Sequence, residues 1–347
     1  MLKNKKMVIS AAVILLVVLA IGGYIYYASA TSYVGTVAGE KITRNEYSFF
    51  LGSVKLQMES DANLTDEASR EAFWNSKVEG NDARAVAKQR ALDSAKEFKI
   101  QLIKAREKKL FLNDKDMKNV EDSIDSLIGE MSAKFQGKPE AEKEFKKIYN
   151  ISFKQYKEVL KDLMLVYKFV QEEQKGISVT EEDMKAEYDK NSNKFDKVTV
   201  RHILFPTKNL QTGEPLSNDE QKKADDKSKE TLEKINNGGD IEALAKELSA
   251  DPTAKDNGGI IEMDYTRGIP EIKDWAMKEK VGTLSVVQSE FGYHVVKLEK
   301  RTSYNDVKDK VKNSITSEKY QKILEQWTKE SQYNLVENKF ALDSVKV

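Results

Sequence analysis

The spacing of apolar residues changes twice along this chain, and that change limits the possible folds more than any other feature. Apolar residues recur every three or four positions over 82–112, 117–135 and 156–170, which is the pattern of amphipathic helices. From Lys197 the pattern becomes one of strands and short helices, and helical spacing returns at Asp306. We therefore expect an α+β protein in which helical segments from both ends pack together, with a separate unit inserted between them.

The inserted unit begins with a β-branched and aromatic segment, residues 198–205, which is bounded by Pro206 and is typical of a strand. The next expected elements are helices over 218–238 and 240–248, a loop over 251–259, a strand over 260–264, a helix over 271–280 and strands at 286–287 and 293–298. The short connection between the last two strands indicates a hairpin. The order β-α-α-β-α-β-β predicts a small domain around a four-stranded, mostly antiparallel sheet.

Charge and cysteine content exclude several classes of protein. The 347 residues include 57 Lys or Arg and 57 Asp or Glu, so there is no excess of positive charge. Binding to a nucleic-acid backbone needs a basic surface, and we expect no nucleic-acid partner. The chain has no cysteine, which excludes disulfides, thiolate metal sites, a cysteine nucleophile and a lipid-modified N-terminal cysteine.

The N-terminal segment predicts the compartment. Three lysines precede an uncharged run over residues 7–27, which is about long enough to span a bilayer. The lysines favour a cytoplasmic N-terminus, and tyrosines at the end of the run fit an interfacial aromatic belt. Ala28-Ser29-Ala30 also resembles a cleavage site, so residues 1–30 are either a membrane anchor, which we favour, or a removed signal. We expect a single-pass protein of the cell membrane, with residues 31–347 outside the cytoplasm.

Short motifs across residues 197–301 resemble the parvulin, or PpiC-type, family of peptidyl-prolyl isomerases. They are Arg201-His-Ile-Leu204, Asn237-Gly-Gly-Asp240, Ser249-Ala-Asp251, Gly258-Gly259 and Phe291-Gly-Tyr-His294, in the family's order. The flanks resemble the PrsA and SurA groups of extracytoplasmic folding factors at residues 37–46 and 176–188. The resemblance implies a helical chaperone region over 31–196, an isomerase domain over 197–301, and a helical segment over 302–347 that packs on the chaperone lobe.

The resemblance also implies the catalytic residues. Prolyl isomerisation rotates an amide bond against a barrier of about 18–20 kcal/mol, and we expect no metal or cofactor to take part. His202 and His294, the only two histidines, would lie side by side and hydrogen-bond across the floor of the site. Asp251 would face the substrate amide, although Asp-Pro also commonly starts a turn. Ser289 would lie beside His294, although a strand serine can also face solvent. A metal site on the two histidines would lack further ligands at suitable spacing.

An apolar pocket is expected to bind the proline ring. Ile272 stands where the family usually has phenylalanine, and an isoleucine lacks the flat face that stacks on a pyrrolidine ring. Lower turnover is therefore expected. The aliphatic side chains expected in this pocket can also be ordinary core residues, and as such they need no functional explanation. The expected pocket residues are Ile261, Met263, Ile269, Ile272 and Phe291.

Two functions fit these features. The first is a prolyl isomerase joined to a chaperone lobe that holds unfolded or partly folded secreted polypeptides through their X-Pro segments. The second is a catalytically weak or inactive holdase that keeps the parvulin fold as a scaffold or peptide-binding surface. Departures from the family at Ile272, Glu262 and Val286 motivate the second function. The helical lobe could also support a homodimer.

Overall fold

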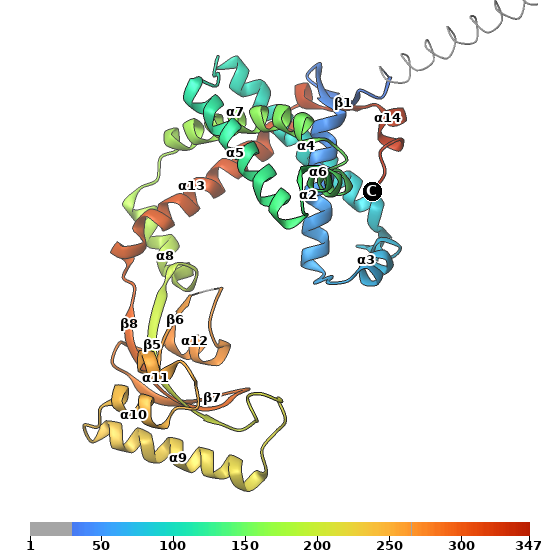
Figure 1. The fold of residues 1–347 in the computed structure, drawn as a ribbon. Coiled ribbons are helices and arrows are strands. Elements are labelled where there is room, and N and C mark those ends of the chain that lie inside the picture. Colours follow the sequence, from blue (N-terminus) through green and yellow to red (C-terminus); the bar gives the residue numbers. More distant parts are fainter. Residues whose placement is uncertain (1–29, 265) are drawn as a thin grey trace, which may run out of the picture. The chain divides into compact units, whose positions relative to one another are not determined.

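The computed structural model describes residues 30–264 and 266–347, which divide into two compact units (Figure 1). The first unit, termed the helical lobe, contains residues 30–177 and 319–347. The second, termed the sheet unit, is Ser178–Glu318. The predicted α+β class and the predicted insertion of a sheet domain between helical segments are confirmed.

A small sheet in the helical lobe joins the two ends of the described chain. Strand β1 (Tyr33–Val37) pairs antiparallel with β2 (Glu40–Thr43) and with β9 (Leu335–Glu337), which gives the order β2-β1-β9. The tight turn between β1 and β2 needs positive φ, which Gly39 adopts at +82°. Because β9 comes from the C-terminal segment, the predicted packing of the two flanks is confirmed.

Helices make up most of the helical lobe. Three of them, α4, α5 and α7, are the amphipathic helices that the apolar spacing predicts. In α4, Ala87, Ala91 and Ala95 are fully buried, and their small side chains allow close packing against β1 and α2. The elements are α2 (Arg44–Asp61), α3 (Glu67–Trp74), β3 (Lys77–Val78), β4 (Asn81–Asp82), α4 (Ala83–Glu107), α5 (Asp114–Lys134), α6 (Lys138–Tyr149), α7 (Phe153–Gly176), the end of α13 (Tyr304–Lys329), the 3₁₀ turn η1 (Ser331–Tyr333) and α14 (Lys339–Asp343).

Capping boxes start several of these helices. At the start of α2, the Thr43 hydroxyl accepts from the Glu46 N–H, and the Glu46 carboxylate accepts from the Thr43 N–H. Ser152 begins α7 in the same way. In the sheet unit, Ser217 does so for α9 (Asn218–Asn236). Local sequence therefore fixes where these helices begin.

The sheet unit is built on a four-stranded antiparallel sheet with the order β6-β5-β8-β7. The predicted order of elements is confirmed, except that the expected loop over 251–259 contains a short helix, α11. The strands are β5 (Lys197–Pro206), β6 (Ile260–Asp264), β7 (Leu284–Ser289) and β8 (Gly292–Arg301), and the other helices are α8 (Glu181–Phe195), α10 (Ile241–Leu248), α11 (Ala254–Asn257) and α12 (Pro270–Ala276).

The sheet unit extends beyond the predicted 197–301 on both sides. Met184 and Phe195 of α8 pack with Val307, Val311 and Ile315 at the start of α13. This packing joins the segments on either side of the sheet to the sheet unit and not to the helical lobe. The local spacing of apolar residues does not predict such long-range contacts.

Successive side chains of β5 lie on opposite faces of the sheet, and each face has its own apolar cluster. Val198 and Val200 pack on one face with α12. Ile203 and Phe205 pack on the other face with α9 and α10 (Figure 1). His202 alternates in step with Val200, so its imidazole lies on the α12 face.

The predicted membrane span over residues 7–27 lies outside the described residues. Within 30–264 and 266–347, no helix is long and apolar enough to cross a membrane. The single-pass membrane location therefore stays a prediction.

Candidate active site

Strand register brings the two histidines together. In the antiparallel pair of β5 and β8, His202 lies opposite Val296 and His294 lies opposite Leu204, so the imidazoles are diagonal neighbours on one face. Their Nδ1 atoms are 3.1 Å apart and their ring centroids 5.3 Å apart. Both side chains are buried. The hydrogen bond between the histidines that the resemblance implies is present.

Each imidazole has a second partner, so the four predicted polar residues form one continuous network. His202 Nε2 lies 2.9 Å from Asp251 Oδ2, and His294 Nε2 lies 2.8 Å from Ser289 Oγ. The Phe291 N–H donates to Ser289 Oγ at 3.1 Å. Ser289 is buried and does not face solvent. Asp251, with 21% of its side chain exposed, is the most accessible of the four.

The ends of the network determine where its protons lie. Ser289 Oγ accepts from the Phe291 N–H, and the only acceptor in the network for its own proton is His294 Nε2. His294 then donates from Nδ1 to His202, which donates from Nε2 to Asp251. Every group is satisfied with both imidazoles neutral and the carboxylate ionised. The reversed direction would need a protonated carboxyl and would leave the Ser289 proton without an acceptor in the network.

The pKa values agree with this charge state. Burial, with a smaller contribution from His202, lowers the pKa of His294 to about 3. Burial also lowers the pKa of His202, against the opposing effect of the Asp251 carboxylate. Burial alone would raise the pKa of Asp251, but hydrogen bonds from Thr253 and His202 outweigh it and hold that pKa below its ordinary value. At neutral pH the network therefore carries one negative charge, on Asp251.

The loop after α10 holds Asp251 through its second oxygen. The Thr253 N–H and hydroxyl both donate to Asp251 Oδ1 at 2.9 Å. Ser249 Oγ accepts from the Leu204 N–H on β5 and from the Asp251 N–H, which ties the loop to the strand. Asp251 is therefore a turn residue as well as a network member. Sequence reasoning missed Ser249 and Thr253 as site residues, although Ser and Asp commonly bond to the backbone two residues later.

Two motif glycines allow other segments to approach β5 closely. The Gly259 carbonyl accepts from the His202 N–H at 2.8 Å, and Gly259 has φ of +78°. A Cβ at this position would lie 2.3 Å from the His202 carbonyl oxygen. A Cβ at Gly292, where φ is +141°, would lie 2.2 Å from the Phe205 carbonyl oxygen. A larger residue at either position would displace the strand that carries His202.

The five residues expected to bind the proline ring differ in exposure. Met263 and Ile272 are 1% and 0% exposed and belong to the apolar core on the α12 face. Ile261 and Ile269 are half-buried at the edge of the same cluster. Phe291 is half-buried outside it. Three of the five therefore have surface that a ligand can contact, whereas Met263 and Ile272 support that surface from beneath.

No three His, Asp or Glu side chains in the described part of the chain are grouped so as to hold a metal ion. The four ring nitrogens of His202 and His294 are all engaged by protein atoms. A metal at this position would have to displace the hydrogen bonds of the network.

A family comparison covers the same segment. Residues 184–302 match the family model of the PPIC-type PPIASE domain. The chain contains a PPIC-type prolyl isomerase domain. This PPIC-type domain includes the whole network and also most of α8, in agreement with the packing of α8 in the sheet unit.

The chain is similar to foldases over most of its length. It is 28% identical over 298 residues to the foldase protein PrsA of Caldanaerobacter subterraneus subsp. tengcongensis, which covers 84% of this chain and 82% of that protein. It is 25% identical over 333 residues to the foldase protein PrsA of Clostridium botulinum strain 657, covering 89% and 90%. The crystal structure of the foldase protein PrsA from Streptococcus pneumoniae aligns with a TM-score of 0.35 and 22% identity, over 75% of this chain and 96% of that chain. The sequence comparisons confirm the resemblance that the motifs predict.

Proposed function

We propose that this chain is an extracytoplasmic foldase. Its PPIC-type domain would catalyse peptidyl-prolyl cis–trans isomerisation, and its helical lobe would hold the unfolded secreted polypeptides that contain the X-Pro bonds. The observation that carries the proposal is the continuous network from Asp251 through His202 and His294 to Ser289. Similarity to PrsA foldases along most of the chain supports the wider assignment.

Asp251 is the residue proposed to act on the substrate amide. In a planar X-Pro amide, resonance places negative charge on the carbonyl oxygen, and rotation about the C–N bond removes that charge. A fixed carboxylate near this oxygen destabilises the planar state more than the twisted state and so lowers the barrier. Asp251 is ionised, accessible and held at both of its oxygens. About 1.4 kcal/mol of differential interaction increases the rate about tenfold.

His202, His294 and Ser289 are proposed as positioning residues. Each of them donates a hydrogen bond to the next group along the network, and the last bond is donated to Asp251. Together they stabilise the ionised carboxylate and fix its direction. Neither imidazole needs to change charge during rotation of the amide bond. The network therefore orients the site and does not transfer protons.

The proline ring is proposed to lie against the exposed parts of Ile261, Ile269 and Phe291. Ring carbons removed from water would contribute about 25 cal/mol for each Å² buried. Met263 and Ile272 would keep these side chains in place from the core.

The helical lobe is proposed to contact clients through exposed aromatic side chains. Phe111 is 71% exposed and Tyr167 is 60% exposed. The Lys168 ammonium donates to the Phe111 carbonyl oxygen at 3.1 Å, which places the two aromatic residues on adjacent segments. Exposed aromatic side chains would contact the apolar parts of an unfolded client. Residues 1–30 are proposed to attach the chain to the cell membrane, and a homodimer through the lobe stays a prediction.

An isomerase assay on a proline-containing peptide tests the site. Asp251→Asn removes the charge, and His202→Ala removes the donor that orients it, so we expect each to slow isomerisation between tenfold and a hundredfold. Lys222→Gln, at an exposed position on α9, is the control and should leave the rate unchanged. Wild-type rates in both site variants would rule out this assignment.

A catalytically weak or inactive holdase is the second candidate. The observation that favours it is the full burial of Ile272, which leaves the pocket without an exposed aromatic face at that position. A holdase would suppress aggregation of an unfolded client without detectable isomerisation. Phe111→Ala with Tyr167→Ala would then weaken client holding and leave any peptide isomerisation unchanged, which separates the two activities.

A further inference from the structure

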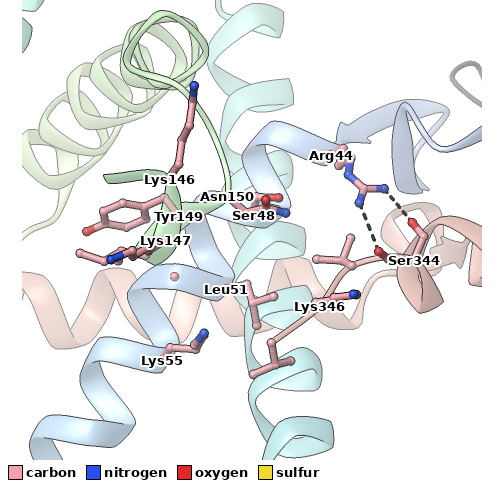
Figure 2. Close-up of a pocket in the computed structure, with 14 residues that line it drawn as sticks. Arg44, Ser48, Leu51, Lys55, Lys146, Lys147, Tyr149, Asn150, Ser344 and Lys346 are labelled. Atoms are coloured by element: carbon pink, nitrogen blue, oxygen red, sulfur yellow. Dashed lines mark hydrogen bonds between the residues drawn. The ribbon is translucent and has the colours of Figure 1, made fainter. Parts of the chain in front are cut away.

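A cavity with a volume of about 370 Å³ lies in the helical lobe (Figure 2). Its walls come from α2, the end of α6 and residues 344–347. Arg44 of α2 donates through Nη1 to Ser344 Oγ at 2.7 Å and through Nη2 to the Ser344 carbonyl oxygen at 3.3 Å, so it holds the last segment against α2 (Figure 2). All lining residues belong to the helical lobe, and the cavity is therefore no part of the isomerase domain.

The lining of this cavity is cationic. It contains five basic side chains and no acidic one, whereas the chain as a whole has 57 residues of each sign. Cations gathered around a partly enclosed space create a positive potential that favours an anionic ligand. The basic residues are Arg44, Lys55, Lys146, Lys147 and Lys346.

Existing ion pairs offset only part of this charge. Lys146 pairs with Glu142 at 3.4 Å, and Lys147 pairs with Glu144 at 2.5 Å, both within α6 and with exposed lysines. Pairs between exposed residues of one helix are weak, so a ligand can replace them readily. Burial lowers the pKa of Lys55, against the opposing effect of the nearby Glu59 carboxylate.

Ser48 gives a second, independent indication of a ligand. Its side chain lines the cavity and is buried, with 3% exposure of the residue, and its Oγ has no hydrogen-bond partner among the described residues. A serine inside a helix usually bonds back to the carbonyl four residues earlier or faces solvent, and Ser48 does neither. A buried hydroxyl without a partner is uncommon in native proteins.

Gly52 explains how the cavity keeps its shape. A Cβ at Gly52 would lie 2.5 Å from Tyr149 Cδ1 and 2.8 Å from the Ile148 carbonyl oxygen. The missing side chain therefore lets the end of α6 come close to α2. This approach places Tyr149 and Leu51 in the lining beside the cationic groups.

We propose that this cavity binds the phosphate group of an organic phosphate, with Lys55, Lys346 and Ser48 as donors. A phosphate carries more negative charge than a carboxylate and more acceptor oxygens, so it can satisfy several cationic side chains and a hydroxyl together. The volume lies within the range of small-molecule sites and leaves room for an organic body against Leu51 and Tyr149. A free organic phosphate is a monoester and a phospholipid headgroup is a diester with one negative charge, but both present non-bridging phosphate oxygens to these donors.

Calorimetry on the full chain in a non-ionic detergent tests the ligand class. We expect sn-glycerol 3-phosphate to bind, and to bind more tightly than inorganic phosphate because it fills more of the cavity. Lys55→Gln should raise its Kd about tenfold. Lys115→Gln, an exposed position on α5 away from the cavity, should not change it. Equal binding of a glutamate-rich peptide, or an unchanged Kd in Lys55→Gln, would overturn the proposal.

Ser48→Ala separates a ligand contact from a structural role. Alanine removes an unpaired buried hydroxyl and favours the helix, so the Tm without ligand should stay the same or rise. The Kd for sn-glycerol 3-phosphate should rise about fivefold, because one donor is lost. A lowered Tm with an unchanged Kd would mean that the hydroxyl serves only the fold, and the proposal would fail.

Bilayers distinguish the two sources of the phosphate. The full chain is placed in vesicles of phosphatidylcholine alone or with one-third phosphatidylglycerol, and amine labelling of Lys55 and Lys346 is measured. Protection by phosphatidylglycerol identifies a headgroup, and protection by soluble sn-glycerol 3-phosphate in both vesicles identifies a free ligand. No protection in any condition would contradict the site. Peptide isomerisation should be unchanged throughout, so this proposal and the proposed function succeed or fail separately.

Discussion

The sheet unit buries two neutral imidazoles, whereas the helical lobe buries a full ion pair. Lys99 and Glu46 are each 3% exposed, and Lys99 Nζ lies 2.6 Å from Glu46 Oε1. Glu46 Oε2 accepts from the Thr43 N–H at 2.6 Å in the capping box of α2. In the sheet unit, His202 and His294 avoid the cost of burial by losing their charge. The helical lobe should therefore be sensitive to loss of a partner, and the sheet unit to pH.

The largest expected effect is the loss of Lys99. Lys99→Met leaves the Glu46 carboxylate buried without its counter-ion, so the free energy of unfolding of the helical lobe should fall by about 3–5 kcal/mol. Hydrogen exchange of amides in α2 and α4 measures this loss without interference from the sheet unit. Lys118→Met, which breaks an exposed pair with Asp122, should change the same amides by less than about 0.5 kcal/mol.

Replacing both members of the buried pair sharpens the comparison. Lys99→Met with Glu46→Leu removes both charges and should recover much of the stability lost in the single variant. About 1 kcal/mol should stay lost, because Glu46 is also part of the helix cap. If the double variant is no more stable than Lys99→Met alone, the uncompensated charge of Glu46 is not the cause of the stability lost in Lys99→Met.

Acidification should lower the stability of the sheet unit, in contrast to the helical lobe. Both histidines have a lower pKa in the folded state than in the unfolded state, so the unfolded state binds more protons and stability falls below about pH 6.5. With a pKa of about 3, His294 alone should cost about 1.6 kcal/mol between pH 6.5 and pH 5.

The helical lobe is the internal control for this pH effect. Both histidines of the chain lie in the sheet unit, and burial raises the pKa of Asp162 and Glu97 in the lobe. A raised carboxyl pKa makes the folded state bind more protons, so these groups favour folding as pH falls. Hydrogen exchange at pH 7 and pH 5, corrected for the intrinsic exchange rate, should therefore show a loss confined to the sheet unit. An equal loss in both units would contradict this account.

The comparison also shows what could be predicted from the sequence. The helix α4 and the capping box of Thr43 and Glu46 both depend on residues close together in the chain, and the apolar spacing over 82–112 predicts α4. The partner of Glu46 is Lys99, 53 positions away, and no local pattern records that contact. The histidine pair, 92 positions apart, was predicted because motifs of a known family mark both strands. Where such motifs are missing, as at Thr253, the residue was missed.

Ser289→Ala tests the closed end of the network. It leaves His294 Nε2 and the Phe291 N–H without their partner, so the sheet unit should lose about 1.5 kcal/mol of stability. Urea unfolding, monitored by hydrogen exchange of the amides of β8, measures this loss of stability. Ser285→Ala, on the same strand but half-buried and outside the network, should have a smaller effect. Equal effects of the two substitutions would mean that the network adds no stability beyond ordinary packing.

The smallest expected effect is at Thr253, at the accessible end of the network. Thr253→Val removes the hydroxyl donor to Asp251 Oδ1 and keeps the backbone donor, so the Asp251 pKa should rise. The proposed isomerase activity should then begin to fall at a higher pH on acidification. At neutral pH the carboxylate stays ionised but is less well oriented, and kcat/KM should fall about twofold to threefold. Thr253→Ser restores the hydroxyl and should restore both the rate and the pH profile. Since valine and threonine have nearly the same shape, equal pH profiles for the valine and serine variants would show that this hydroxyl does not tune Asp251.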